Sequence, residues 1–166
     1  MARRCFYSFH YKPDNWRASK VRNIGVVEGN SPASDNDWET VTGGGDEKIK
    51  KWISEQMSGR TCTIILAGSN TANRKWINHE IVESWNRGMG VLVIYIHNIT
   101  DRNDNQTTKG ENPLAYITHG PTRLKLSEIA KAYDPPRSTS PGVYSYISEN
   151  IESWIETAID IRKRNK

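Results

Sequence analysis

The fold is decided by residues 61–96, which contain two apolar runs, Thr61-Cys-Thr-Ile-Ile-Leu-Ala67 and Gly90-Val-Leu-Val-Ile-Tyr-Ile96. Runs of this kind are typical of strands that are buried on both faces. Between them, the segment from Asn73 to Arg87 carries apolar residues at helical spacing and is followed by Gly88, a residue type that often ends helices. This order of strand, helix and strand predicts an α/β fold in which helices cover both faces of a mainly parallel sheet.

Toward the N-terminus, the run Arg4-Cys-Phe-Tyr-Ser-Phe9 predicts a first buried strand. The spacing of Trp16, Val21 and Ile24 after it indicates a helix of moderate amphipathicity. Three further expectations complete this half of the chain: turns over Gly25 to Asp37, a candidate second strand over Trp38-Glu-Thr-Val-Thr42, and a helix over Glu47 to Ser58 with Asp46 as its N-cap.

Toward the C-terminus, the spacing of apolar residues is irregular until the final helix. The loop from Asn98 to Asn112 is polar, Arg123-Leu-Lys-Leu126 predicts an edge strand, and Pro135-Pro136 leaves the neighbouring residues without an assignment. Apolar residues at helical spacing from Ile147 to Ile159 predict the last helix. The 166 residues match the usual size of one domain, so we expect a single domain over 1–166, with a core over about 4–126 and a C-terminal helix over about 143–164.

Composition excludes several classes of protein. Hydrophobic residues make up 36% of the chain and charged residues 25%, which fits a globular protein and not a disordered one. The longest apolar run, Val91 to Ile96, is too short to span a membrane, and the N-terminus has no signal-peptide pattern, so we expect a cytoplasmic protein. Cys5 and Cys62 both lie in strand-like runs and are expected to be buried free thiols, as in a reducing compartment.

Charge and motifs narrow the chemistry further. The net charge is +4, and the C-terminal run Arg162-Lys-Arg-Asn-Lys166 complements a helix dipole, a role that we favour over a nucleic-acid-binding arm. The cluster Gly43-Gly44-Gly45 lacks the spacing of a dinucleotide-binding loop, and the sequence has no GxxxxGK[ST] element. The four histidines show no zinc-binding spacing, and no GxSxG element occurs, so we expect neither a metal site nor a serine triad.

Helix geometry singles out Glu80 as a candidate. At about 100° per residue, Ile77, Ile81 and Trp85 form the face that packs on the sheet, and Glu80 lies at the rim of that face, about 60° from Ile77. The loop Gly68-Ser-Asn-Thr71 leads into this helix from the carboxyl end of a strand, where open α/β sheets place their clefts. Geometry alone leaves open that Glu80 is a surface residue paired with a nearby Lys or Arg.

Three segments resemble the TIR-like domain family, and within it the TIR-like proteins of bacterial Thoeris anti-phage systems. These segments are Phe6-Tyr-Ser-Phe-His-Tyr11, Thr63-Ile-Ile-Leu-Ala-Gly-Ser-Asn-Thr71 and Asn73-Arg-Lys-Trp-Ile-Asn-His-Glu-Ile81. The resemblance implies a flavodoxin-like TIR fold. It also implies that Glu80 is the residue essential for NAD cleavage and that Trp76, four residues earlier, lines the substrate pocket.

The same resemblance implies further site residues and partners. Ser8, His10, Tyr11 and Ser69 are expected to bind substrate together with Trp76, although a strand-end hydrogen bond would equally explain Ser8, and simple exposure would explain His10. NAD is the substrate, so no cofactor is expected. The implied partners are an effector protein that senses the nucleotide product and a phage-derived trigger. Self-association stays open, no membrane partner is expected, and nucleic-acid binding is disfavoured.

NAD cleavage requires fewer catalytic groups than hydrolysis of an ordinary glycoside, which needs two carboxyl groups. The nicotinamide leaves as a neutral molecule, so one carboxylate that stabilises the positive ribosyl group is sufficient. Water as the attacking group gives ADP-ribose, whereas an atom of the same molecule gives a cyclic isomer. We therefore expect an NAD glycohydrolase or ADP-ribosyl cyclase that makes a second messenger. The alternative is a non-enzymatic TIR module that assembles with other TIR domains.

Overall fold

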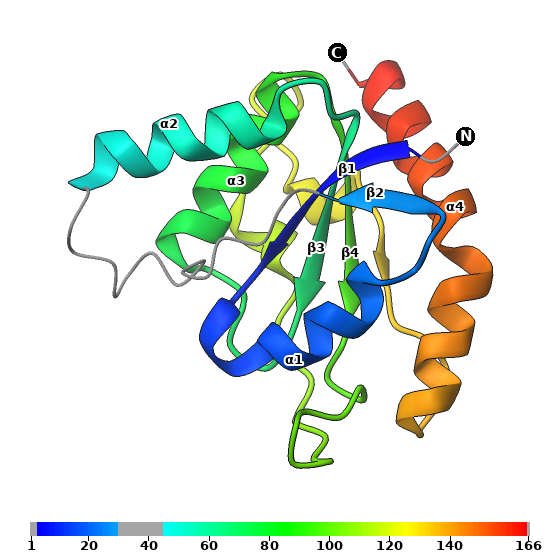
Figure 1. The fold of residues 1–166 in the computed structure, drawn as a ribbon. Helices are drawn as coiled ribbons and strands as arrows, with labels where there is room; N and C mark the ends of the chain where they lie inside the picture. Colours follow the sequence, from blue (N-terminus) through cyan, green and yellow to red (C-terminus); the bar gives the residue numbers. More distant parts are fainter. Residues whose placement is uncertain (1–2, 30–44, 166) are drawn as a thin grey trace.

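The centre of the protein is a parallel sheet, seen in a computed structural model that describes residues 3–29 and 45–165 (Figure 1). The strand order across the sheet is β2-β1-β3-β4-β5, and each of these neighbouring pairs is parallel. The strands are β1 (Arg3–Phe9), β2 (Val27–Gly29), β3 (Cys62–Ala67), β4 (Gly90–Tyr95) and β5 (Ala132–Tyr133).

Helices cover both faces of this sheet (Figure 1). The apolar residues of α1 and α4 join one buried cluster with the sheet, and those of α2 and α3 join the clusters on the opposite face. This arrangement is the α/β, flavodoxin-like architecture that the sequence led us to expect. The helices are α1 (Tyr11–Arg22), α2 (Gly45–Met57), α3 (Lys75–Asn86) and α4 (Ser140–Arg164), with short 3-10 helices η1 (Pro113–Tyr116) and η2 (Leu126–Glu128).

Burial on both sides explains the apolar runs of the central strands. Successive side chains of a strand point to opposite faces. Along β1, Cys5, Tyr7 and Phe9 join the cluster beneath α1 and α4, whereas Phe6 and Ser8 contact residues of α2 and α3. Both sets are buried. Ser8, a polar residue near the end of the strand, is therefore presented to α3.

The fold class predicted from the sequence is confirmed. The strands predicted over Arg4–Phe9, Thr61–Ala67 and Gly90–Ile96 correspond to β1, β3 and β4, which are parallel neighbours. The helix predicted over Asn73–Arg87 is α3, and the one predicted over Glu47–Ser58 is α2.

One edge of the sheet lies in a segment that was predicted as turns. Val27–Gly29 forms β2 through parallel pairs with Arg3, Arg4 and Cys5 of β1. An edge strand of three residues carries too few side chains for alternation to reveal it. The candidate strand over Trp38–Thr42 lies outside the described residues.

The predicted edge strand over Arg123–Leu126 is wrong. Arg123 has φ +58°, which no regular strand allows, and Lys125 makes an isolated antiparallel bridge with Thr118 before Leu126 begins η2. The alternation of Leu124 and Leu126 therefore belongs to a tight hairpin. The edge strand on this side is β5, in a segment that the prolines left unassigned.

Asp46 does not cap α2 as predicted, because the helix already includes Gly45. Asp46 lies in the first turn instead, and its carboxylate contacts Lys75 Nζ at 2.7 Å. The ion pair links the beginning of α2 to the beginning of α3. Both ends belong to the side of the molecule that holds the candidate site.

Cys5 and Cys62 are buried free thiols, as predicted. Across residues 3–29 and 45–165, no helix combines the length and the apolar run needed to cross a bilayer. The same ranges hold no group of three or more His, Cys, Asp or Glu side chains placed to bind a metal ion.

The strand β4 and the helix α4 approach each other closely at Gly90. A Cβ atom at this position would lie 2.7 Å from the backbone nitrogen of Ile159 and 2.8 Å from the carbonyl carbon of Ala158. Both distances are shorter than van der Waals contact. The absence of a side chain at Gly90 therefore allows α4 to pack directly on the sheet.

Candidate functional site

The candidate site lies at the carboxyl edge of the sheet, where β1 and β3 lead into α1 and α3. The loop before α3 turns sharply. The Gly68 N–H donates to Thr71 Oγ1 at 2.8 Å, and Asn73 has φ +62°, a conformation that Asn adopts more readily than most residues. After this turn, α3 begins at Lys75.

Ser8 and Glu80 form a buried pair between β1 and α3. The hydroxyl of Ser8 donates to Glu80 Oε1 at 2.7 Å. The exposed fractions of the two residues are 0% and 3%. Glu80 therefore lies deeper than the rim position expected from helix geometry, and the alternative of a surface ion pair is wrong.

Burial changes the acidity of this carboxyl group. Loss of solvent raises the pKa of Glu80 to about 8, and the hydrogen bond from Ser8 opposes that rise only in part. Near neutral pH, the carboxyl is therefore mostly protonated in this conformation. A pKa displaced this far by burial is more common at functional sites than elsewhere.

Hydroxyl groups tie the turn of α3 that carries Glu80 to the sheet. Ser84 Oγ donates to the backbone carbonyl of Glu80 at 2.6 Å, and it lies 2.6 Å from Thr63 Oγ1. Because the Ser84 proton points to that carbonyl, Thr63 is the donor in the second bond. The side chains of Thr63, Glu80 and Ser84 are all buried. These hydrogen bonds therefore fix the position of Glu80 relative to β3.

Trp76 belongs to the core between α2 and the sheet. Its exposed fraction is 5%, and it joins a cluster that includes Phe6, Ile53 and Met57. Lys75 Nζ lies 4.9 Å from the centre of the indole ring. In this conformation the ring is covered by protein and offers little surface for stacking on a nucleotide.

A polar cleft of about 560 Å³ opens at the N-terminal end of α3. Two of the predicted substrate-binding residues, His10 and Ser69, line it, whereas Ser8, Trp76 and Glu80 do not. Its volume falls in the range of ligand pockets. The lining residues are His10, Ser69, Asn70, Ala72, Asn73, Arg74, Lys75, Glu111 and Tyr116.

Tyr11 lies away from both the cleft and Glu80. Its ring stacks on Phe9, with the ring centres 6.2 Å apart, and packs against the cluster beneath α1 and α4. That cluster is on the face of the sheet opposite α3. The structure therefore brings Ser8 to Glu80 and His10 to Ser69, but it brings Tyr11 to neither pair.

Glu111 and Tyr116 line the cleft and were missed by sequence reasoning. The Tyr116 hydroxyl donates to the Glu111 carboxylate. The chain reaches this position because Gly110 packs against the loop after β3, where a Cβ would lie 2.5 Å from the Gly68 carbonyl oxygen. The signal that the sequence offers for this wall is Gly110 itself, in the run Lys109-Gly-Glu-Asn-Pro113.

Arg17 of α1 anchors the loop that leads to Glu111. The Arg17 side chain is buried, and its Nε and Nη2 donate to the carbonyls of Ile99 and Asn105 at 2.7 and 2.9 Å. Its Nη1 also donates to Asp14 Oδ1 at 3.2 Å. Charge-assisted bonds of this kind are strong when buried, so the far wall of the cleft is tied to α1.

Comparison with known proteins places these features in a family. Residues 6–101 match the family described as Thoeris protein ThsB, TIR-like domain. A relative from Bacillus cereus (strain MSX-D12), named "Putative cyclic ADP-D-ribose synthase ThsB1", is 34% identical over 122 residues. That alignment covers 70% of this chain and 64% of the relative, so the chain spans less than two thirds of the relative's length. The family match extends from β1 through β4 and so includes Ser8, Ser69, Trp76 and Glu80.

Proposed function

Because this chain belongs to the TIR-like family of Thoeris ThsB proteins, we propose that it cleaves NAD and converts the ADP-ribosyl group into a cyclic ADP-ribose isomer or a related messenger. The name of the Bacillus cereus relative supports this class of reaction. Within the structure, one observation carries the proposal. It is the buried pair formed by Ser8 of β1 and Glu80 of α3, on the side of the molecule where a polar cleft opens at the N-terminal end of α3.

In the proposed reaction, Glu80 acts as an anion beside the ribose. The bond between the nicotinamide nitrogen and C1′ of the ribose breaks, and its electron pair leaves with the nicotinamide, which becomes neutral. Positive charge then develops on the ribosyl carbon, and a carboxylate placed there stabilises it. Since the leaving group takes up no proton, the reaction needs no second carboxyl group of the kind that glycosidases use.

The raised pKa of Glu80 couples its ionisation to substrate binding. In the free protein, burial holds the pKa near 8. The nicotinamide ring of NAD is positively charged, and an opposite charge nearby lowers the pKa of a carboxyl group. Bound NAD would thus favour the carboxylate that its own cleavage requires, with Ser8 remaining as a hydrogen-bond donor.

The cleft suits the phosphate and ribose parts of NAD. Arg74 and Lys75 supply positive charge for the diphosphate, His10 and Ser69 add hydrogen-bonding groups, and Glu111 can accept from ribose hydroxyls. Glu80 does not line the cleft and is only 3% exposed. The proposed reaction therefore requires the side chains over Glu80 to move when NAD binds.

The wider proposal follows the family. The protein uses NAD as a substrate, with no cofactor or metal, in the cytoplasm. A phage-derived trigger activates it, and its product activates an effector protein. A second candidate function is a non-enzymatic TIR module that assembles with other TIR domains, and the burial of Glu80 is the observation that favours it.

Mass spectrometry of small molecules after incubation with NAD and a lysate of phage-infected cells distinguishes the two candidates. We expect the wild-type protein to release nicotinamide and Glu80→Gln to do so at a rate lower by a factor of about 10² or more. Glu83→Gln is a matched control, because Glu83 lies on the same helix, partly exposed and paired with Arg87 at 3.0 Å. Equal rates of nicotinamide release by wild type and Glu80→Gln would refute the role of Glu80, and no product from either protein would favour the assembly module.

A further inference from the structure

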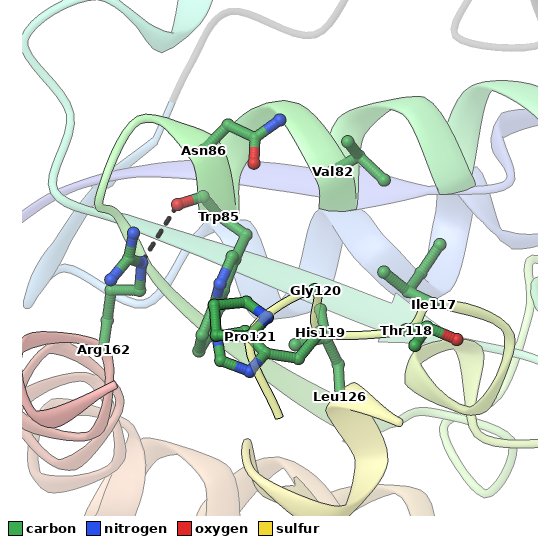
Figure 2. Close-up of a pocket in the computed structure, with 10 residues that line it drawn as sticks. All are labelled: Val82, Trp85, Asn86, Ile117, Thr118, His119, Gly120, Pro121, Leu126 and Arg162. Carbon is green, nitrogen blue, oxygen red and sulfur yellow. Dashed lines mark hydrogen bonds between the residues drawn. The ribbon is translucent and has the colours of Figure 1, made fainter. Parts of the chain in front are cut away.

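A second cavity, of about 320 Å³, lies at the C-terminal end of α3, away from the polar cleft (Figure 2). One wall is α3, the opposite wall is the hairpin between η1 and η2, and Arg162 of α4 closes one end (Figure 2). The cleft at the other end of α3 shares none of its residues. The lining residues are Val82, Trp85, Asn86, Ile117, Thr118, His119, Gly120, Pro121, Leu126 and Arg162.

Arg162 places a fixed positive charge at this end of the cavity. Its guanidinium lies 4.7 Å from the ring centre of Trp85, and its Nε donates to the Trp85 carbonyl at 3.0 Å (Figure 2). Its Nη1 donates to the carbonyl of Asn165, also at 3.0 Å. Within the described residues, Nη2 has no hydrogen-bond or ion-pair partner. A pre-positioned guanidinium with free donors is suited to a carboxylate.

His119 adds a second polar group to the lining. The side chain is 4% exposed, and its Nδ1 is hydrogen-bonded to Thr122 Oγ1 at 2.7 Å. The ring meets the Trp85 indole edge-on, with centres 5.5 Å apart, so both rings are held in place. Over the part of the chain that the structure describes, His119 Nε2 has no partner, which leaves one ring nitrogen to bond an occupant.

The remaining walls are apolar. Ile117, Pro121 and Leu126 come from the hairpin side, and Val82 faces them from α3 with 40% of its surface exposed. An occupant with a flat apolar body would cover these side chains while its charged end reached Arg162. A pocket of this size also suits a small molecule better than a protein, because protein interfaces bury a much wider surface.

We propose that this cavity is a binding site for a small aromatic carboxylate, with the ring between α3 and the hairpin and the carboxylate on Arg162. The site is separate from the cleft, so its occupant is not the substrate of the proposed reaction. The proposal stands whether or not the protein cleaves NAD. It does place a ligand against Trp85, the residue after Ser84, whose hydroxyl holds the turn that carries Glu80.

Titration with 2-naphthoate, followed by saturation-transfer NMR and calorimetry, tests the site. We expect saturable binding to the wild-type protein and binding at least tenfold weaker to Arg162→Met. Arg164→Met is the control, because Arg164 lies two residues further along α4, is exposed, pairs with Asp160 and does not line the cavity. Its affinity should stay within twofold of wild type. The neutral 2-naphthamide, with the same ring system, should bind at least tenfold more weakly than the acid.

A further variant covers the case in which Arg162→Met unfolds. Val82→Asp adds a negative charge at an exposed position of the wall and should weaken 2-naphthoate binding at least fivefold while the melting temperature is kept. The proposal is overturned if 2-naphthoate does not bind saturably, if the amide binds as tightly as the acid, or if wild-type affinity persists in folded Arg162→Met or in Val82→Asp.

Discussion

The substitution Glu80→Gln should stabilise the protein at alkaline pH while it slows NAD cleavage by a factor of about 10² or more. Glutamine has nearly the size of a protonated glutamate and can still accept the hydrogen bond from Ser8. It carries no charge at any pH. Burial opposes the ionisation of Glu80, and glutamine cannot ionise. The variant therefore removes this unfavourable ionisation.

The magnitude follows from the two pKa values of the carboxyl group. An unfolded chain loses this proton near pH 4.5, whereas burial in the folded protein keeps it to about pH 8. Between these values the folded protein binds more protons than the unfolded chain, so its stability falls as the pH rises through that window. At about 1.4 kcal/mol per pH unit the full loss is about 5 kcal/mol, which is an upper limit because the site can relax around the charge.

Urea unfolding at about pH 5, 7 and 9 measures this loss. Glu80→Gln should lie within about 1 kcal/mol of wild type near pH 5 and exceed its free energy of unfolding by about 2–5 kcal/mol near pH 9. Glu83→Gln should differ from wild type by less than about 1 kcal/mol throughout, because its ion pair is partly exposed. A difference between Glu80→Gln and wild type that stays constant across pH would refute the reasoning, since it would mean that Glu80 is not protonated in the folded state.

Three further predictions follow from the same structure. Arg17→Met should lower the free energy of unfolding by about 3–5 kcal/mol, because the Asp14 carboxylate and two loop carbonyls lose their buried partner. Urea unfolding of this variant and of the surface control Arg87→Met measures the difference. Gly90→Ala should cost about 1–3 kcal/mol and lower the melting temperature, since the added Cβ meets the α4 backbone, whereas Gly25→Ala, with no atom within 4 Å, should not. Release of nicotinamide should continue in excess EDTA, because a neutral leaving group needs no Lewis acid; loss of activity that a single divalent metal restores would contradict this.

The sequence predicted the central elements well because their burial is almost complete. In β3 and β4 every residue is buried, so the apolar runs are continuous and carry no ambiguity. The edge strands β2 and β5 have three and two residues; burial is mixed along β2, and both residues of β5 are half-buried. The periodicity of hydrophobic residues does not reveal strands this short, because their pairing depends on the neighbouring strand and not on their own side chains.

For the site, the sequence singled out Glu80 but not its surroundings. Helix periodicity placed it at a rim, whereas α2 packs over that side of α3 and leaves it 3% exposed. Tyr11 adjoins His10 in the chain, yet its ring joins the cluster on the opposite face of the sheet. The far wall, with Glu111, reaches the cleft through the close approach of Gly110 to the loop after β3.

The sequence by itself therefore determined the α/β class, the helix that carries Glu80 and the family, because periodicity and local motifs are properties of neighbouring residues. Only the tertiary structure decided which polar groups meet. Ser8 and Glu80 are separated by 72 residues in the chain and by 2.7 Å in space. The pKa of Glu80 is also decided by the tertiary structure, because it depends on how much water the packing of β1, α2 and α3 excludes from the carboxyl group.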